Sequence, residues 1–252
     1  MTAMKLYNKY KAKVKIPAGL KKKTALYSLP IVLLLAVLLS VSLMQTGKRE
    51  KKQAMQGETS TLVIDPGHGG IDGGALAQDG TRESDINLAI ALRLRAIAEL
   101  CGKDNTLLRS DDSTKCDTPE YSERRDLEKR TELVNKTANP IYIGIHQNCY
   151  PTGQPSGAQV IYSDFSGSEL LAKITLSNLI STLDPTNRRV AEPLTRKLYI
   201  LSNAKCPAIL VECGFMSNFS DIQKLKSTEY QTALAVNLMA SYIQYIDNTV
   251  CI

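Results

Sequence analysis

Strand and helix signals alternate along residues 61–246, and this alternation restricts the possible folds more than any other feature. Short β-rich runs are predicted at 61–64, 106–108, 141–145, 158–162, 198–201 and 208–211. Amphipathic helices are predicted at 84–101, 119–136, 167–183 and 227–246. This order predicts an α/β fold, in which helices cover both faces of a single mixed, largely parallel sheet of about six strands.

A different pattern precedes this domain. Residues 25–44 form an uncharged apolar run of twenty positions, long enough to cross a bilayer as one helix. The excess of lysine before the run predicts that the N-terminus is cytoplasmic and that the rest is exported. We therefore expect a basic tail at 1–24, a transmembrane anchor or signal segment at 25–46, a polar tether at 47–60 and the domain at 61–252. A cleaved signal peptide is the alternative, because Ser40-Val41-Ser42 offers a cleavage site, but the length of the run favours an anchor.

The distribution of charge argues against a nucleic-acid partner. The chain carries +6 overall, of which residues 1–24 contribute eight lysines and residues 47–60 a net +2, so that −4 remains for 61–252. A mildly acidic domain does not suit the phosphate backbone. The 43% apolar and 22% charged composition also excludes wholesale disorder and a polytopic membrane protein.

Four chemically active residues are predicted at one edge of the sheet. The two histidines of the chain, His68 and His146, each follow or end a predicted strand. Glu83 opens the helix after the first loop, and Glu212 ends the last strand. Ligands gather at the carboxyl ends of strands in such folds. Two histidines and a carboxylate with one open position are typical of a catalytic zinc site, and a further carboxylate can act as a general base.

Each of these residues also has a plainer interpretation. His68 could be a turn residue, His146 a core residue, Glu83 a helix-terminal charge and Glu212 a partner for a lysine. The glycines around His68 could also belong to a phosphate-binding loop. Neither Gly-Lys-Ser/Thr nor G-x-G-x-x-G is present, however, so we do not favour that loop.

The motifs resemble those of the zinc-dependent N-acetylmuramoyl-L-alanine amidases, which act on bacterial peptidoglycan. Four segments carry the resemblance in the family's order: Val63 to Gly70 with Asp72-Gly73-Gly74-Ala75, Glu83 to Ile90, Ile145-His146-Gln147-Asn148, and Pro207 to Glu212 with Gly214-Phe215 and Ser217-Asn218. Gly144 stands where the family usually has serine, which leaves open what supports His146. Arg130 and Asn135 also fall where the family keeps such residues, and we expect a structural ion pair or surface contact there.

The resemblance implies that His68, Glu83 and His146 bind one Zn²⁺ and that Glu212 is the catalytic base. It also implies hydrolysis of the amide between N-acetylmuramic acid and L-alanine, with peptidoglycan as the substrate. A short, membrane-tethered domain resembles the sporulation-specific cortex amidases in particular, and a vegetative role in cell separation is the alternative. Whether an activator protein is needed is left open.

Six cysteines, at positions 101, 116, 149, 206, 213 and 251, leave two rival functions open. Cys149 or Cys213 could complete a structural Cys2His2 zinc site in a non-catalytic module, or act as the nucleophile of a cysteine peptidase. Alternation along strands argues against both, because Cys213 should point away from Glu212, and Cys149 away from His146. Disulfides are possible in an exported domain of this size but are not required.

Overall fold

The computed structural model describes residues 60–116, 121–152, 154–195 and 197–250. The tail, the anchor and almost all of the tether predicted from the sequence lie outside these residues. Among the described residues, no helix is both long enough and apolar enough to span a bilayer.

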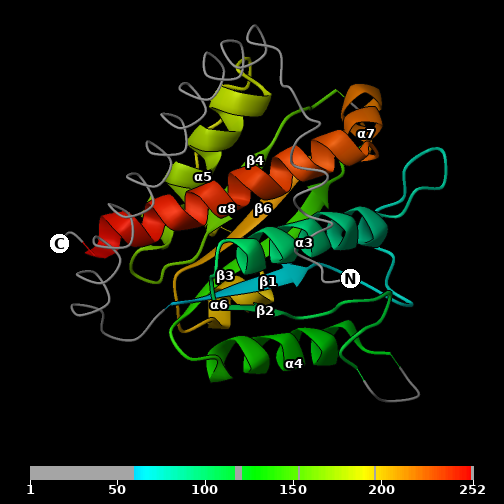
Figure 1. The fold of residues 1–252 in the computed structure, drawn as a ribbon. Coiled ribbons are helices and arrows are strands. Elements are labelled where there is room, and N and C mark those ends of the chain that lie inside the picture. Colours follow the sequence, from blue (N-terminus) through cyan, green and yellow to red (C-terminus); the bar gives the residue numbers. More distant parts are fainter. Residues whose placement is uncertain (1–59, 117–120, 153, 196, 251–252) are drawn as a thin grey trace, which may run out of the picture. The chain divides into compact units, whose positions relative to one another are not determined.

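A six-stranded sheet forms the centre of the domain (Figure 1), in the order β2-β1-β3-β6-β4-β5. Pairing is parallel throughout, except that β4 runs antiparallel to β6. The predicted mixed, largely parallel sheet is therefore confirmed. The strands are β1 (Thr61–Pro66), β2 (Asn105–Leu107), β3 (Pro140–Asn148), β4 (Gln159–Tyr162), β5 (Glu192–Pro193) and β6 (Ala208–Phe215).

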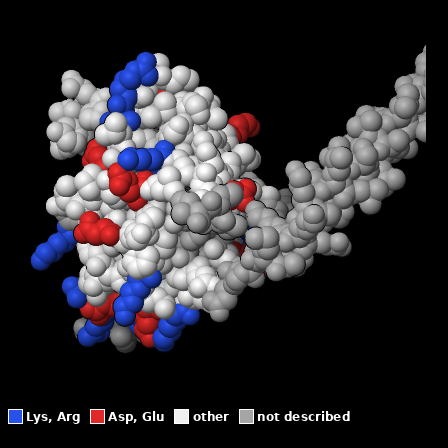
Figure 2. Space-filling model, turned by 90° about the vertical axis from the view of Figure 1, so that its left-hand side faces the viewer, with Lys and Arg blue, Asp and Glu red and all other residues white. Residues whose placement is uncertain are grey.

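Helices cover both faces of this sheet, as predicted. On one face, α3 (Glu83–Leu100), α5 (Ser168–Leu183) and α8 (Thr228–Val250) pack over the larger apolar core. On the other face, α4 (Glu123–Lys136) and α6 (Tyr199–Asn203) cover the smaller core, and α7 (Phe219–Leu225) follows β6. Figure 2 shows the side where the parallel strands begin. Basic and acidic side chains are mixed over α4 there, in keeping with ion pairs such as Lys136–Glu132.

The predicted strand at 198–201 is wrong, because these residues contribute to α6. Ile200 and Leu201 are both buried against the smaller core, and neighbouring residues on a strand would point to opposite faces. A four-residue apolar run does not distinguish one helical turn from a short strand. The sequence reasoning also missed β5, which has two residues, and α7, whose first turn is capped by the Asn218 side chain.

Alternation along the central strands decides which side chains reach the site. Ile143 and Ile145 of β3 face the larger core, whereas Tyr142 faces the smaller one. His146 has the same parity as Tyr142, so it lies on the α4 side of the sheet, at the end of β3. Glu212 of β6 is in register with His146. These two residues, which were predicted at one edge of the sheet, lie next to each other on paired strands.

Candidate metal centre

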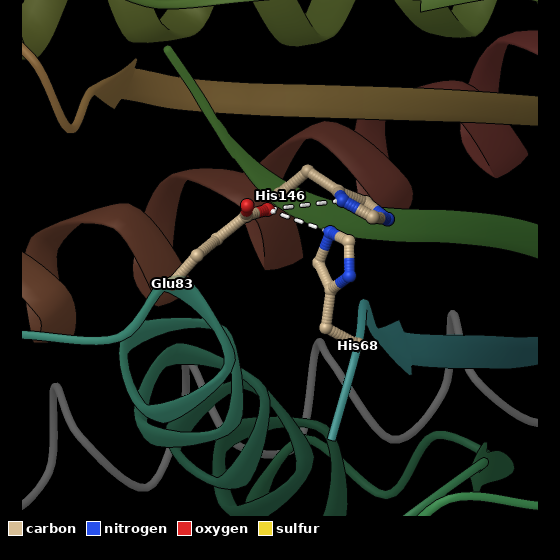
Figure 3. A group of neighbouring side chains, drawn as sticks. All are labelled: His68, Glu83 and His146. Carbon is tan, nitrogen blue, oxygen red and sulfur yellow. Dashed lines mark hydrogen bonds and ion pairs between the residues drawn. The ribbon is translucent and has the colours of Figure 1, made fainter. Parts of the chain in front are cut away.

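Three of the four predicted site residues form one cluster. His68, Glu83 and His146 each contribute a potential ligand atom, and these atoms all lie within 4.8 Å of one another. The residues come from the loop after β1, the first turn of α3 and the end of β3 (Figure 3). Segments up to 78 residues apart in sequence are brought together because two parallel strands and a helix N-terminus meet at one sheet edge.

Glu83 is the centre of this cluster. Its Oε1 atom lies 3.1 Å from Nδ1 of His146 and 3.3 Å from Nε2 of His68, as the dashed lines in Figure 3 mark. The same oxygen accepts a hydrogen bond from the Gln147 backbone N–H, and Oε2 accepts one from Ala75 N–H. Glu83 is only 3% exposed. Burial alone would raise its pKa, but the two histidines outweigh burial and hold it well below its usual range.

His68 is held by a second carboxylate. Its Nδ1 atom lies 2.8 Å from Oδ2 of Asp72, which also accepts a hydrogen bond from the Tyr121 hydroxyl at 3.1 Å. Burial lowers the pKa of His68, yet hydrogen bonds and charges from Asp72 and Glu83 raise it to about 10. The pocket between these carboxylates therefore stabilises positive charge, as a cation site must.

Asp72 and Tyr121 were not predicted as part of the site. Asp72 lies within the first motif of the chain, and its spacing of four from His68 in a loop gave no sign of contact. Tyr121 reaches the site from the segment before α4, which no periodic pattern connects with His68.

Two glycines are required by close approach. A Cβ atom at Gly67 would lie 2.1 Å from the His146 ring, and one at Gly74 would lie 2.6 Å from Oε2 of Glu83. Gly74 also has a φ of 66°, which side chains rarely adopt. Part of the glycine-rich first motif thus makes room for the ligands.

Glu212 stands beside the cluster and is not part of it. It is 6% exposed and lines the same cavity of about 370 Å³ as His68, Glu83 and His146. The far wall of this cavity is formed by α4 and by Lys197 to Leu201. A buried carboxylate therefore lies next to the three potential ligands.

The cysteines do not complete the cluster in the described part of the chain. Among the described cysteines, Cys101, Cys149, Cys206 and Cys213 form no disulfide. Cys213 lies in the larger core, on the opposite face from Glu212 as expected, and burial raises the pKa of its thiol to about 12. The prediction for Cys149 is wrong, since it lines the cavity. Cys149 follows the last residue of β3, so strand alternation does not fix the direction of its side chain.

The remaining positions of the resemblance are also explained. At Gly144, a Cβ atom would lie 2.8 Å from the Tyr142 hydroxyl, which occupies this space and donates to Oδ2 of Asp65. The nearest charged partner of His146 is Glu83, whose Oε1 atom lies 3.1 Å from its Nδ1 atom. Arg130 forms ion pairs with Asp65 and Asp126, and Asn135 makes backbone contacts to Asn203 and Lys205. Both are structural contacts, as predicted.

Comparison with known proteins identifies the family. Residues 62–243 match the model of the N-acetylmuramoyl-L-alanine amidase family. This chain belongs to that family. It is 32% identical over 189 residues to the germination-specific N-acetylmuramoyl-L-alanine amidase of Bacillus subtilis, which covers 73% of this chain and 78% of the relative. The CwlD amidase from Clostridioides difficile, solved in complex with the GerS lipoprotein, superposes with a TM-score of 0.70 and 33% identity. That match covers 75% of this chain and 99% of the solved one.

Membership of this family fixes the activity. The protein is a hydrolase that cleaves the amide bond between N-acetylmuramic acid and L-alanine in peptidoglycan. Its substrate places it outside the cytoplasm. A third relative, the sporulation-specific amidase of Bacillus subtilis, is 32% identical over 178 residues, covering 69% of this chain and 63% of the relative.

Proposed function

We propose that this amidase uses one Zn²⁺ held by His68, Glu83 and His146, with Glu212 as the general base. The observation that carries the proposal is the cluster of three potential ligand atoms beside a fourth, buried carboxylate. Atoms that share one zinc ion lie about 2.0–2.1 Å from it, so they are at most about 4.2 Å apart. The nitrogen–oxygen distances of 3.1 and 3.3 Å meet this limit.

The chemistry follows from these residues. When bound, zinc polarises the scissile carbonyl and acidifies a water molecule. Glu212, next to His146 across the β3–β6 pair, takes the proton of the attacking water and delivers it to the leaving amine of L-alanine. Asp72 keeps the His68 ring oriented, with Nδ1 toward Asp72 and Nε2 toward Glu83.

Metal analysis of single variants tests this assignment. His68→Ala, Glu83→Ala and His146→Ala should each lose zinc and activity, whereas the control Cys149→Ser should keep both. Activity is read by mass spectrometry of digested peptidoglycan, as new L-alanine amino ends. Chelation should abolish it and added zinc restore it, whereas a cysteine peptidase would survive chelation. Zinc lost from Cys149→Ser or Cys213→Ser, but kept by Glu83→Ala, would show a structural site instead.

We further propose that the enzyme remodels spore cortex. Similarity to germination- and sporulation-specific amidases supports this role. Deletion of the gene should leave the N-acetylmuramic acid–L-alanine amides of purified cortex uncleaved. Chains of unseparated vegetative cells with normal cortex would indicate the alternative role. Because the CwlD amidase was solved with a lipoprotein, we propose an extracytoplasmic lipoprotein as the class of partner. Co-purification from sporulating cells checks this.

The proposed location is an uncleaved anchor at 25–46, with the catalytic domain outside the cytoplasm. Lysine asymmetry around the apolar run supports it. All six cysteines lie beyond residue 100, so an impermeant thiol reagent should label reduced protein on intact cells. A mature chain that begins near residue 43 would show a signal peptide instead.

A further inference from the structure

The backbone of His68 has an unusual conformation. Its φ is 61°, in the left-handed region, and among the described residues only Asn139 is a second non-glycine residue with positive φ. Such a conformation is energetically unfavourable for a residue with a Cβ atom, and it persists only where the surroundings impose it. The interactions that impose it here can be identified.

Three successive carbonyl groups in this loop point toward two buried arginines. Arg109 donates from Nε to Pro66 O and from Nη2 to Gly67 O, both at 2.9 Å. Arg130 donates from Nη1 to Pro66 O at 3.0 Å and from Nη2 to His68 O at 2.7 Å. Each arginine is 1% exposed. The two guanidinium groups therefore hold the main chain on both sides of the His68 Cα atom.

Arg109 and Arg130 differ in how their charge is balanced. Arg130 forms ion pairs with Asp65 and Asp126. In the described part of the chain, the hydrogen bonds of Arg109 go to carbonyl oxygens, those of Pro66, Gly67, Ser84 and Asp111. Burying a cation without a directly bonded carboxylate carries a free-energy cost. A buried arginine of this kind therefore needs a role beyond filling the core.

The bonds of Arg109 supply this reason. Its Nη2 atom bonds to Gly67 O and, at 2.9 Å, to Ser84 O. Gly67 precedes His68, and Ser84 follows Glu83 in the first turn of α3. One nitrogen atom thus links the two backbone segments that carry the two ligands, and it fixes their separation without touching either ligand side chain.

We propose that Arg109 and Arg130 are positioning residues that hold His68 in its left-handed conformation, at a set distance from Glu83, before a metal ion binds. The proposal rests on the assignment of His68 and Glu83 as zinc ligands. It goes beyond a structural role because it makes zinc affinity depend on the geometry of two planar guanidinium groups, and not only on their charge.

The direct test is Arg109→Lys in the detergent-solubilised full-length protein. Lysine keeps the charge but cannot reproduce the planar fork that joins Gly67 O to Ser84 O. Zinc affinity, measured by competition with a chromophoric chelator, should fall by roughly 10–100-fold, the range typical of residues that support a ligand. The zinc affinity of Arg130→Lys should fall by a factor in the same range. The absorption spectrum of the cobalt-loaded protein should also shift in both variants.

Two controls separate positioning from general loss of stability. Arg93→Lys alters an arginine of α3 that bonds to Thr232 and Ala89 O, remote from the His68 loop, and it should bind zinc normally. Leu179→Ala removes a buried side chain of α5 and should lower the melting temperature without changing zinc affinity. If Arg109→Lys and Arg130→Lys melt at lower temperature but bind zinc as tightly as the wild type, the proposal is overturned.

A measurement on the unaltered protein covers the case in which the arginine variants do not fold. In the structure, Gly67 N–H donates to Ile145 O and Gly69 N–H donates to Asp72 O. A loop that is already held should protect these amides from hydrogen exchange to within about tenfold of the zinc-loaded protein. Exchange more than a hundredfold faster without zinc would show that the metal, and not the arginines, orders the loop. This outcome is independent of whether the proposed ligands are correct.

Discussion

The two sides of the metal site are built in different ways. The strand side, His146 and Glu212, lies on β3 and β6, where main-chain pairing in the middle of the sheet fixes both residues. The loop side, His68 and Asp72, follows β1, where His68 has a left-handed backbone that regular pairing cannot hold. On the loop side, hydrogen bonds from buried side chains hold the backbone in place. On the strand side, main-chain hydrogen bonds between strands have this role.

This difference predicts which substitutions should disturb the orientation of the site residues. A residue on a central strand keeps its direction as long as the sheet forms, so its neighbours can vary. A residue on an irregular loop depends on each group that bonds to that loop. We therefore expect substitutions around the loop ligand to act through metal affinity. On the strand side, we expect substitutions other than those of the ligand His146 itself to act through chemistry or stability.

The largest effect is expected from Glu212→Gln on the strand side. The amide keeps the shape of the side chain but cannot accept the proton, and loss of a general base costs about 10²–10⁴-fold in rate. Zinc content should stay near normal because Glu212 is outside the three-residue cluster. The matched variant Glu83→Gln should lose zinc and activity together and be partly rescued by excess zinc. If Glu212→Gln lost its metal as readily, the two roles would be misassigned.

Gly67→Ala should be nearly as damaging, because it brings the two sides into collision. The new Cβ atom would lie 2.1 Å from Cε1 and 2.2 Å from Nε2 of His146. The ring must be displaced from its position beside Glu83, so we expect zinc affinity to fall by roughly 100-fold. Gly80→Ala is the control, since a Cβ there meets nothing within 4 Å, although its φ of 87° makes it a test of strain alone. Normal zinc binding by Gly67→Ala would contradict the close contact between the sides.

A smaller effect is expected from Asp72→Asn, which weakens the support of the loop ligand. The amide oxygen can still accept from Nδ1 of His68, but the negative charge is lost. Zinc affinity should fall by about tenfold, at the lower end of the range for such partners. Tyr121→Phe removes only the hydroxyl that donates to Asp72, so its zinc affinity should fall by less than that of Asp72→Asn. Competition with a chelator measures the zinc affinity of both variants. An equal loss in the two variants would show that the hydroxyl, and not the charge, orients the ring.

The same contrast explains what the sequence could predict. His146 and Glu212 were found because strand ends in a parallel sheet share an edge. Their adjacency was not predicted, because β3 and β6 are not consecutive strands and only the sheet order makes them neighbours. Asp72 and Tyr121 were missed because their contacts arise from loop geometry, which leaves no period in the sequence. The misassigned 198–201 segment has the same cause, since a short apolar run gains its structure from the core against which it packs.

The smallest effect is expected from Gly144→Ser, which gives the strand side the serine usual in the family. Its Cβ atom would lie 2.8 Å from the Tyr142 hydroxyl, so overpacking should lower the free energy of unfolding by about 1–3 kcal/mol. Tyr142→Phe alone should lower the free energy of unfolding by about 1 kcal/mol, because Oδ2 of Asp65 loses a donor while Arg130 still pairs with Oδ1.

The double variant relieves the crowding at the hydroxyl, so the two losses of unfolding free energy, measured by urea denaturation, should be less than additive. Zinc affinity should stay near that of the wild type throughout, because neither residue bonds to the His68 loop and the ion pair of Arg130 with Asp65 is kept. Additive losses would show that the hydroxyl does not fill the space left by Gly144, and a fall in zinc affinity would show that the strand side depends on its neighbours as the loop side does.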